Sequence, residues 1–447
     1  MNGGLNKVIN VSLYLHKFRF ICHLSNKHNM DKTKMHPESL MMSFGYKPHL
    51  SEGAVKCPIF QTSTFAFKTA EEGKAFFEVA YGKREKGADE ELGLIYSRLN
   101  NPDLEILENR LCLWDKSDDA AVFESGMSAI STILLEFLKP GDLLLFSNPI
   151  YGGTDHFIKH FLTKIGIHVL GFTPSDTGAD IEAMIEAHPA KDNLAMIYIE
   201  TPANPTLDLF DIEECVAIAK KYSRSEEERV LVAVDNTYMG PIWQHPLQHG
   251  ADLVVYSATK YIGGHSDVIA GAVLGSFPLM ARVKGLRTFL GNMASPHTGW
   301  LLMRSLETLK IRMERQALTA EKVAEYLIAH PKVERVYYLG HLEGKDERHI
   351  DIYKRQYTSA GAMLSFDIAG GEKDAFKVLN AMQLVKLAVS LGSTESLAEH
   401  PATMTHAGVD EELRDQFNIS GKLIRLSVGV EHPDDLIADL GQALDKI

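Results

Sequence analysis

The sequence predicts an α/β protein: a large domain with a mostly parallel β-sheet covered by helices, followed by a smaller α+β C-terminal domain. Between about residues 104 and 275, short apolar runs alternate with stretches whose apolar residues recur every three or four positions. After about residue 296 this alternation stops and a long helical pattern begins. With 447 residues the chain is too long for one ordinary core, so we expect two or three packed domains.

The first 95 residues contain few helical signals, and we expect an N-terminal extension and arm over residues 1–95. Residues 1–29 are a candidate for disorder. They contain no acidic residue but several basic ones, which is typical of an organellar transit peptide. Translation from an upstream start codon, with Met30 as an alternative start, explains the same stretch, and both interpretations stay open.

The predicted large domain covers residues 96–296. Strands are expected at its apolar runs, which are Leu143–Ser147, Ile167–Phe172, Leu194–Glu200, Leu231–Asp235, Leu253–Ser257 and Ala270–Gly275. Helical spacing occurs between these runs, as in Ser128–Leu138 and Ile212–Tyr222. This succession of strand and helix indicates βαβ units.

The predicted C-terminal domain covers residues 297–447. Its pattern predicts one long helix over Leu301–Leu327 and strands at Val333–Tyr338 and Ala362–Ile368. Helix and strand are less regularly interleaved here, so we expect an α+β arrangement.

Composition excludes several classes of protein. Lysine and arginine number 46 and aspartate and glutamate 59, so the net charge is 46 − 59 = −13. This balance argues against nucleic-acid binding, which needs a basic face. No apolar run reaches the roughly 18 residues that span a bilayer, so we expect no membrane insertion and a cytoplasmic location.

The four cysteines are Cys22, Cys57, Cys112 and Cys215, and they form neither a CxxC pair nor a metal-ligand spacing. A disulfide scaffold would be short and cysteine-dense. The cysteines therefore predict free thiols in a reducing compartment, and no metal site is expected.

The strongest chemical signal is a lysine that follows an apolar strand. Ser257, Thr259 and Lys260 end the run that begins at Leu253, and a glycine pair follows. A lysine beside such permissive backbone is well placed to form an imine with an aldehyde cofactor. Ser257 and Thr259 alternate, so both hydroxyls are expected to face the same side and bind a phosphate. The plainer alternative is a surface lysine after a strand.

A second signal favours an imine-forming lysine over a surface lysine. Asp235 follows four apolar residues, where a carboxylate is costly unless a cation meets it. In pyridoxal 5'-phosphate (PLP) enzymes an aspartate pairs with the ring nitrogen and keeps it protonated. Asp235 and Lys260 are 260 − 235 = 25 residues apart and could bind one ring at its two ends. A helix cap or a structural turn is the alternative for Asp235.

Two weaker signals complete the pattern. Gly126 and Met127 follow Ser125 at the start of a predicted helix, and a helix N-terminus suits a phosphate dianion. Tyr151 follows a predicted strand and could stack on a ring, although packed tyrosines are common.

In this order and spacing the motifs resemble the Cys/Met-metabolism (trans-sulfuration) family of PLP enzymes, nearest to its methionine γ-lyases, cystathionine γ-lyases and cystathionine γ-synthases. The resemblance runs from about Gly45 to the C-terminus. It rests on Tyr96-Ser97-Arg98, Ser125-Gly126-Met127, Tyr151-Gly152-Gly153-Thr154, Glu200-Thr201-Pro202-Ala203-Asn204-Pro205, Asp235-Asn236-Thr237, Ser257-Ala258-Thr259-Lys260 and Arg425 to Gly429. It implies a PLP fold type I (aminotransferase-like) architecture and a homotetramer built from two active dimers.

The resemblance also implies a role for each matching residue. Lys260 would carry PLP as a Schiff base and move protons, and Tyr151 would stack on the ring and act as an acid. The other implied cofactor contacts are Asp235 at the ring nitrogen, Asn204 near the phenolic oxygen, Gly126, Met127, Ser257 and Thr259 at the phosphate, and Tyr96 and Arg98 at the phosphate of the partner subunit. Arg425 would grip the substrate α-carboxylate as a fork, beside Ser390.

Among the family's reactions we expect γ-elimination from methionine or cystathionine, which gives 2-oxobutyrate, ammonia and a thiol. Val389 is apolar where a glutamate often meets a distal ammonium, which favours methionine. However, Gly153 stands where methionine γ-lyases usually carry a cysteine, Arg287 and Thr288 replace an expected lysine–aspartate pair, and residues 77–94 form a long charged loop.

Two alternatives remain. The first is γ-replacement on an O-acyl-homoserine, as in a cystathionine γ-synthase or homoserine sulfhydrylase. The second is a catalytically silent scaffold, which the joint presence of Lys260, Asp235, Tyr151 and Arg425 disfavours. In each catalytic case the partner is a small amino-acid substrate.

Overall fold

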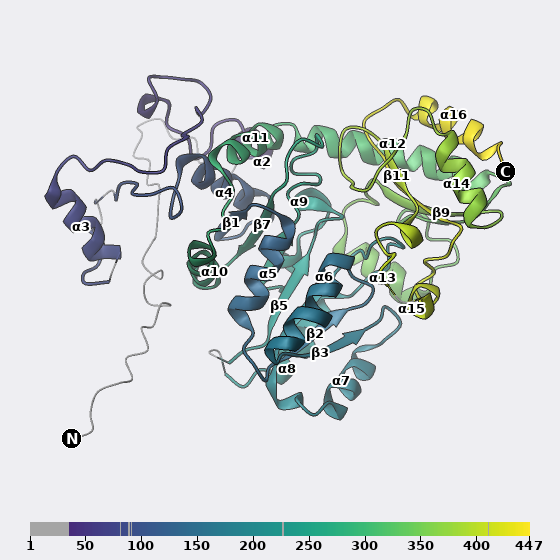
Figure 1. Ribbon diagram of the computed structural model, residues 1–447, viewed down its shortest axis with the longest axis horizontal. Helices are drawn as coiled ribbons and strands as arrows, with labels where there is room; N and C mark the ends of the chain where they lie inside the picture. Colours follow the sequence, from purple (N-terminus) through teal and green to yellow (C-terminus); the bar gives the residue numbers. More distant parts are fainter. Residues whose placement is uncertain (1–34, 81, 88–89, 91, 226–227, 410) are drawn as a thin grey trace.

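The computed structural model describes residues 35–447 except 81, 88–89, 91, 226–227 and 410. The extension predicted for residues 1–29 lies outside these residues. Figure 1 shows an N-terminal arm that projects from the body, a large α/β region, and a second sheet with helices at the end that holds the C-terminus. No helix in the described part of the chain has both the length and the apolar character needed to cross a bilayer.

The large region is organised around a seven-stranded sheet with the order β1-β7-β6-β5-β4-β2-β3. Its strands are β1 (Asp119–Phe123), β2 (Leu143–Ser147), β3 (His168–Phe172), β4 (Leu194–Glu200), β5 (Leu231–Asp235), β6 (Leu253–Tyr256) and β7 (Gly271–Gly275). Only β7 runs antiparallel to its neighbours within this sheet. The predicted α/β class with a mostly parallel sheet is therefore confirmed, although β1 was not predicted.

Helices cover both faces of this sheet because parallel strands bury both of their faces. The helices of this region are α4 (Pro102–Asp115), α5 (Gly126–Phe137), α6 (Gly152–Phe157), α7 (Gly178–Ala187), α8 (Ile212–Tyr222), α9 (Gly240–Trp243) and α10 (Phe277–Leu290). One face packs against α5 and α10, and the other against α7 and α8. Alternate residues of β5, such as Ala233 and Val234, enter these two separate cores.

The C-terminal region holds a five-stranded sheet with the order β10-β11-β12-β9-β8. Its strands are β8 (Val333–Tyr337), β9 (Met363–Ile368), β10 (Lys386–Leu387), β11 (Leu397–Glu399) and β12 (Leu423–Ser427). Its helices are α12 (Leu309–Ala329), α13 (Glu347–Gln356), α14 (Glu372–Ala381), α15 (Glu411–Gln416) and α16 (Pro433–Leu444). Helices α12, α14 and α16 pack on the sheet in one apolar core.

The single helix predicted over Leu301–Leu327 is wrong, because two helices occupy this stretch. α11 (Pro296–Leu306) ends before α12 begins. In a continuous helix the carbonyl of Ser305 would accept the N–H of Leu309. It accepts instead from the Thr308 N–H, at 3.2 Å, and from the guanidinium of Arg312, at 3.0 Å. This competition ends α11.

The arm is more helical than the sequence predicts. It contains α2 (Pro37–Leu40) and α3 (Ala70–Ala80), and α3 lies at its tip, away from both sheets (Figure 1). Phe76 and Val79 of α3 form a small apolar cluster with Leu92. The shorter helical segments of the chain are η2 (Pro48–Leu50), η3 (Ile158–Leu162), η4 (Thr163–Ile165), η5 (Lys191–Asn193), η6 (Pro246–His249) and η7 (Pro401–Thr403).

Candidate active site

Lys260 lies in a tight turn beyond the end of β6. Its N–H donates to the Ser257 carbonyl at 3.0 Å, and its own carbonyl accepts the Gly264 N–H at 2.7 Å. Gly264 has φ +67°, a backbone conformation that residues other than glycine rarely adopt. The Lys260 ammonium donates to Ser390 Oγ at 2.9 Å. The turn therefore aims the lysine at the C-terminal region.

The prediction that Ser257 and Thr259 alternate along a strand is wrong, because β6 ends at Tyr256. Ser257 lies against the start of α5, where a Cβ on Gly126 would come within 2.9 Å of the Ser257 Cβ. Thr259 Oγ1 instead donates to the Ala270 carbonyl at 3.1 Å and accepts the Ala270 N–H at 3.0 Å. Ser257 thus faces the predicted phosphate site, whereas the hydroxyl proton of Thr259 is committed to the backbone.

Burial lowers the pKa of Lys260 to about 8, with a further contribution from the positive charge of Arg425. Glu399 acts in the opposite direction. At pH 7 this leaves about 300-fold more neutral amine than the ordinary lysine pKa would allow. The neutral amine is the form that attacks an aldehyde or removes a proton.

This pKa gives a testable expectation. The rate at which the cofactor-free protein binds pyridoxal phosphate covalently should rise with pH through about 8 and level off above it, because only the neutral amine reacts. Stopped-flow absorbance across pH 6–10 would measure this profile. A rate that rises through about pH 10.5 would show an ordinary, solvated lysine.

Asp235 ends β5 and is 6% exposed. Its carboxylate accepts the Thr237 N–H at 3.0 Å and the Tyr198 hydroxyl at 3.3 Å. Burial raises the pKa of Asp235 above its ordinary value. A cation held here would restore the charged form, so the position suits a protonated ring nitrogen.

The Asp235 and Lys260 segments are joined directly. Thr237 Oγ1 accepts the Ser257 N–H at 2.8 Å, which ties the turn after β5 to the turn after β6. Because β5 and β6 are parallel neighbours, both segments leave the same edge of the sheet. Ligands of open parallel sheets bind at this edge.

Arg425 lies on β12 with 3% of its surface exposed. Its Nη1 lies 2.7 Å from Glu399 Oε1 and 3.1 Å from Asn204 Oδ1, and its Nη2 donates to the Ser390 carbonyl at 2.8 Å. In the described part of the chain its buried Nε has no hydrogen-bond partner. Nε and one N–H of Nη2 therefore stay available for another acceptor, as a substrate carboxylate requires.

Ser390 joins the two cations of the site. Its hydroxyl accepts from Lys260 and its carbonyl accepts from Arg425, so one residue spans both groups. Ser390 has φ +115°, which is strained for a residue with a side chain. Such strain is often found at functional sites.

Tyr151 caps the N-terminus of α6 and is 43% exposed. Its ring lies over Gly153, where an added Cβ would come within 2.7 Å of Tyr151 Cε1 and 3.2 Å of Met127 Sδ. Gly126 and Met127 begin α5, and Ser125 caps that helix by accepting the Ser128 N–H at 3.0 Å. The first N–H groups of a helix have no acceptor within it, so they can bind a phosphate beside Ser257.

Tyr96 and Arg98 lie between the arm and α4, and they make other contacts. Tyr96 forms an isolated bridge with Thr64, and Arg98 donates to the Thr288 carbonyl at 2.8 Å. No contact between described residues links either of them to Lys260, Asp235 or Arg425. Within one chain the structure does not bring these two residues into the site.

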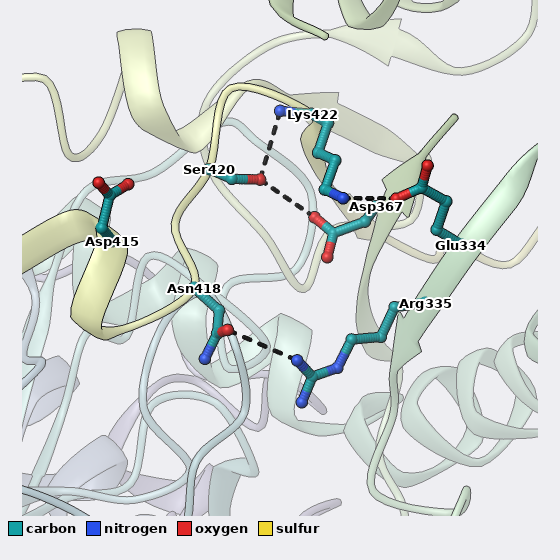
Figure 2. A pocket seen from close by; sticks show the side chains of 7 residues that line it. All are labelled: Glu334, Arg335, Asp367, Asp415, Asn418, Ser420 and Lys422. Carbon is teal, nitrogen blue, oxygen red and sulfur yellow. Dashed lines mark hydrogen bonds and ion pairs between the residues drawn. The ribbon is translucent and has the colours of Figure 1, made fainter. Parts of the chain in front are cut away.

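A pocket apart from these residues lies on the C-terminal region (Figure 2). It is polar, and it is lined by Glu334, Arg335, Asp367, Asp415, Asn418, Ser420 and Lys422. Figure 2 shows that most of these groups pair with one another, for example Lys422 with Glu334 and Ser420 with Asp367. None of the predicted site residues lines it, and we assign it no function.

Sequence reasoning missed two buried carboxylates beside the site. Glu399 is the cross-strand partner of Arg425 and is fully buried. Glu200 lies opposite Asp235 on the neighbouring strand and was noted only as part of a motif. The available signal was an acidic residue at the end of an apolar run, which identified Asp235 and applies equally to Glu200.

The chain is similar in sequence and in fold to known proteins. Residues 38–445 match the family described as Cys/Met metabolism PLP-dependent enzyme. An L-methionine gamma-lyase of Fusobacterium nucleatum subsp. polymorphum is 40% identical over 425 residues, covering 95% of this chain and 100% of the relative. A cystathionine gamma-lyase of Bacillus subtilis is 36% identical over 415 residues, covering 92% of this chain and 100% of the relative. The solved structure of a cystathionine gamma synthase from Xanthomonas oryzae pv. oryzae with cystathionine is 32% identical with a TM-score of 0.80, covering 92% and 98% of the two chains.

Proposed function

Because the chain belongs to the Cys/Met metabolism family of PLP-dependent enzymes, we propose that it γ-eliminates L-methionine to 2-oxobutyrate, ammonia and a thiol. The predicted cofactor and class, a PLP-dependent carbon–sulfur lyase, are confirmed by the family match and by the lyases among the relatives. The choice of methionine depends on Val389. This apolar side chain is 55% exposed next to Ser390, where it suits a thioether methyl better than a charged substrate end.

The described residues fit PLP. Lys260 would bind the aldehyde and Asp235 the ring nitrogen, the α5 N-terminus and Ser257 would hold the phosphate, and Tyr151 would cover the ring. When bound, PLP supplies an aldehyde for the substrate amine and a ring that withdraws electrons from Cα. Asp235 favours that withdrawal by keeping the ring nitrogen protonated.

The side chains would then divide the proton transfers. Arg425 orients the α-carboxylate, and the neutral Lys260 amine removes the Cα proton. Elimination at Cγ also needs a proton taken from Cβ and one given to the departing sulfur. Lys260 would hand the Cα proton on to the bound cofactor, which makes its amine neutral again and able to take the Cβ proton, and the Tyr151 hydroxyl would be the acid for the departing sulfur.

The alternative, γ-replacement on an O-acyl-homoserine, is favoured by Gly153. This position lacks the side chain that methionine γ-lyases usually carry, and the space it leaves is filled by the Tyr151 ring. Replacement differs from elimination only in whether a thiol, rather than a proton, reaches the intermediate. The two functions must therefore be separated by their products.

Product analysis tests the proposal. The purified enzyme would be incubated in parallel with methionine, cystathionine, cysteine and O-acetylhomoserine, with and without an added thiol. We expect methionine to give 2-oxobutyrate and a thiol without any added thiol. In Val389→Glu we expect the preference to move towards cystathionine, because the glutamate can meet its distal ammonium. Turnover only of O-acetylhomoserine, and only with a thiol, would establish replacement instead.

We also propose that the enzyme is a homotetramer whose active sites are shared between subunits. Within the segments around the phosphate site, Ser125–Ala129 and Ser257–Lys260, the only cation is Lys260. The phosphate carries almost two negative charges, so another cation is needed. Arg98 is the candidate that the family resemblance implies, because it directly follows the arm in the sequence, and the arm projects from the body (Figure 1).

Mixing two inactive variants, Arg98→Ala and Lys260→Ala, should restore activity once subunits exchange. In a hybrid dimer one site would collect both defects and the other neither, so up to half of the wild-type activity per dimer should return. Native mass spectrometry would verify the exchange. If exchange is complete and no activity returns, Arg98 serves its own chain or no site.

A cytoplasmic location is also proposed. It is supported by the free thiols of Cys57, Cys112 and Cys215, which fit a reducing compartment. Cell fractionation followed by immunodetection would test it, and enrichment in an organelle fraction would favour the transit-peptide interpretation of residues 1–29.

A further inference from the structure

Glu200 holds the two loops that carry Tyr151 and Asn204. Its Oε2 accepts the Tyr151 N–H at 2.8 Å, and its Oε1 accepts the Asn204 N–H at 3.0 Å. Its own N–H donates to Ser147 Oγ, at the end of β2, at 2.9 Å. Both carboxyl oxygens are thus bonded to the backbone of residues assigned to the site.

The Glu200 carboxyl is buried in surroundings that disfavour its ionised form. Glu200 is 5% exposed, and the positive charge of Arg425, which favours its ionised form, is itself paired with Glu399. Burial and the neighbouring Asp235 raise the pKa of Glu200 to about 8. An apolar residue at this position would leave the N–H groups of Tyr151 and Asn204 without the acceptors that Glu200 supplies.

A carboxyl group suits the task because each of its oxygens has a lone pair that can accept an N–H, in the ionised and in the protonated form. A glutamine would present one acceptor and one donor, and its amide nitrogen would oppose one of the two backbone N–H groups. Holding both loops from one side chain therefore requires glutamate. The consequence extends further, because Asn204 Oδ1 accepts from Arg425 Nη1 at 3.1 Å and from the Tyr238 hydroxyl.

We propose that Glu200 is a positioning residue, whose carboxyl group aligns the Tyr151 ring over the cofactor and Asn204 against Arg425. This proposal rests on the proposed function, since it needs PLP between these groups. Glu200 touches neither substrate nor cofactor in this role. It acts through the backbone of the two residues that do.

The test compares Glu200→Gln with a matched control, Asp439→Asn. Asp439 lies on α16 and is 6% exposed, and it accepts the N–H groups of Gln383, Leu384 and Val385 at 2.8–2.9 Å. α16 lies at the end of the molecule that holds the C-terminus, away from the large sheet (Figure 1). Both variants thus replace by an amide a buried carboxyl that accepts backbone N–H groups, but only one of them lies at the site.

We expect both variants to lose some thermal stability and to keep their PLP. Only Glu200→Gln should alter the visible circular dichroism of bound PLP, which reports the asymmetry around the ring. Its kcat should fall by about 10- to 100-fold, as misplacement of a catalytic group by about 1 Å can cause. In a double-mutant cycle with Tyr151→Phe, the combined loss should be smaller than the product of the two single losses.

Two outcomes would overturn the proposal: an unchanged dichroism spectrum with kcat within twofold of wild type, or fully multiplicative losses in the cycle. If Glu200→Gln does not fold, Glu200→Asp replaces it, because the shorter carboxylate cannot reach both N–H groups, and the same expectations apply. The dichroism readout does not depend on the substrate. If methionine is not turned over, the proposed reaction fails while the role of Glu200 is still tested.

Discussion

Replacement of Lys260 by alanine is expected to reduce multiple turnover by more than about 1,000-fold, because general acid–base catalysis by one side chain contributes roughly 10²- to 10⁴-fold and covalent attachment is lost as well. The variant has no amine to bind the aldehyde and no group to carry the Cα proton. Ser390 Oγ, which accepts from Lys260 Nζ at 2.9 Å, cannot replace it as a base at neutral pH.

Steady-state assays would measure this loss, and absorbance of the bound cofactor would show whether the covalent link has gone. PLP could still bind through its phosphate, so cofactor content after gel filtration should be determined separately. Lys377→Ala is a suitable control, since Lys377 is an exposed lysine paired with Asp374. Wild-type turnover by the Lys260 variant without added amine would contradict the assignment.

The parts of the fold that could be predicted are those whose burial is uniform. β2, β4 and β5 coincide with the predicted runs, because strands buried on both faces are continuously apolar. β1 was missed because two of the residues in Asp119-Ala-Ala-Val-Phe123 are alanines, which are depleted in strands, so the run is a weak strand signal. The break between α11 and α12 was missed because it involves the Arg312 guanidinium, which donates to the Ser305 carbonyl and to the distant Tyr261 carbonyl, and apolar spacing does not encode these bonds.

In the candidate site, too, some residues could be predicted from the local sequence and others could not. Lys260 and Asp235 are recognisable because each places a charge at the end of an apolar run, and the structure brings their segments together through Thr237 and Ser257. Glu399 is not recognisable in this way. It matters only because β11 pairs with β12, which places it opposite Arg425, and no local pattern predicts which strands pair.

The predicted strand position of Thr259 is wrong, while its role at the phosphate stays a prediction. Its place beside Lys260 suggested a phosphate ligand, but the strand ends earlier than its apolar residues indicate. The hydroxyl then turns to Ala270 and bridges the turn to β7. Strand ends depend on where the neighbouring strand stops pairing, and β5 pairs with β6 only as far as Val255.

Replacement of Asp235 by asparagine should lower kcat/KM by about 10³-fold, the scale of losing one preorganised electrostatic contact. Asparagine has nearly the same shape, and its Oδ1 can still accept the Thr237 N–H that Asp235 accepts at 3.0 Å. The amide nitrogen can donate to the Tyr198 oxygen in place of the bond that Asp235 accepts. What is lost is the negative charge that holds a proton on the ring nitrogen.

Stability measurements separate this electrostatic role from a structural one. In the cofactor-free protein the buried Asp235 carboxyl resists ionisation, since burial raises its pKa. Its neutral replacement should therefore leave the cofactor-free protein as stable as the wild type, or more so. With PLP bound, the wild type should be more stable than the variant, because only the carboxylate pairs with the ring cation and so stabilises the complex by linkage.

Differential scanning calorimetry with and without PLP would measure the melting temperatures of both proteins. A loss of activity under tenfold, or equal destabilisation in both states, would assign Asp235 to the scaffold rather than to the cofactor.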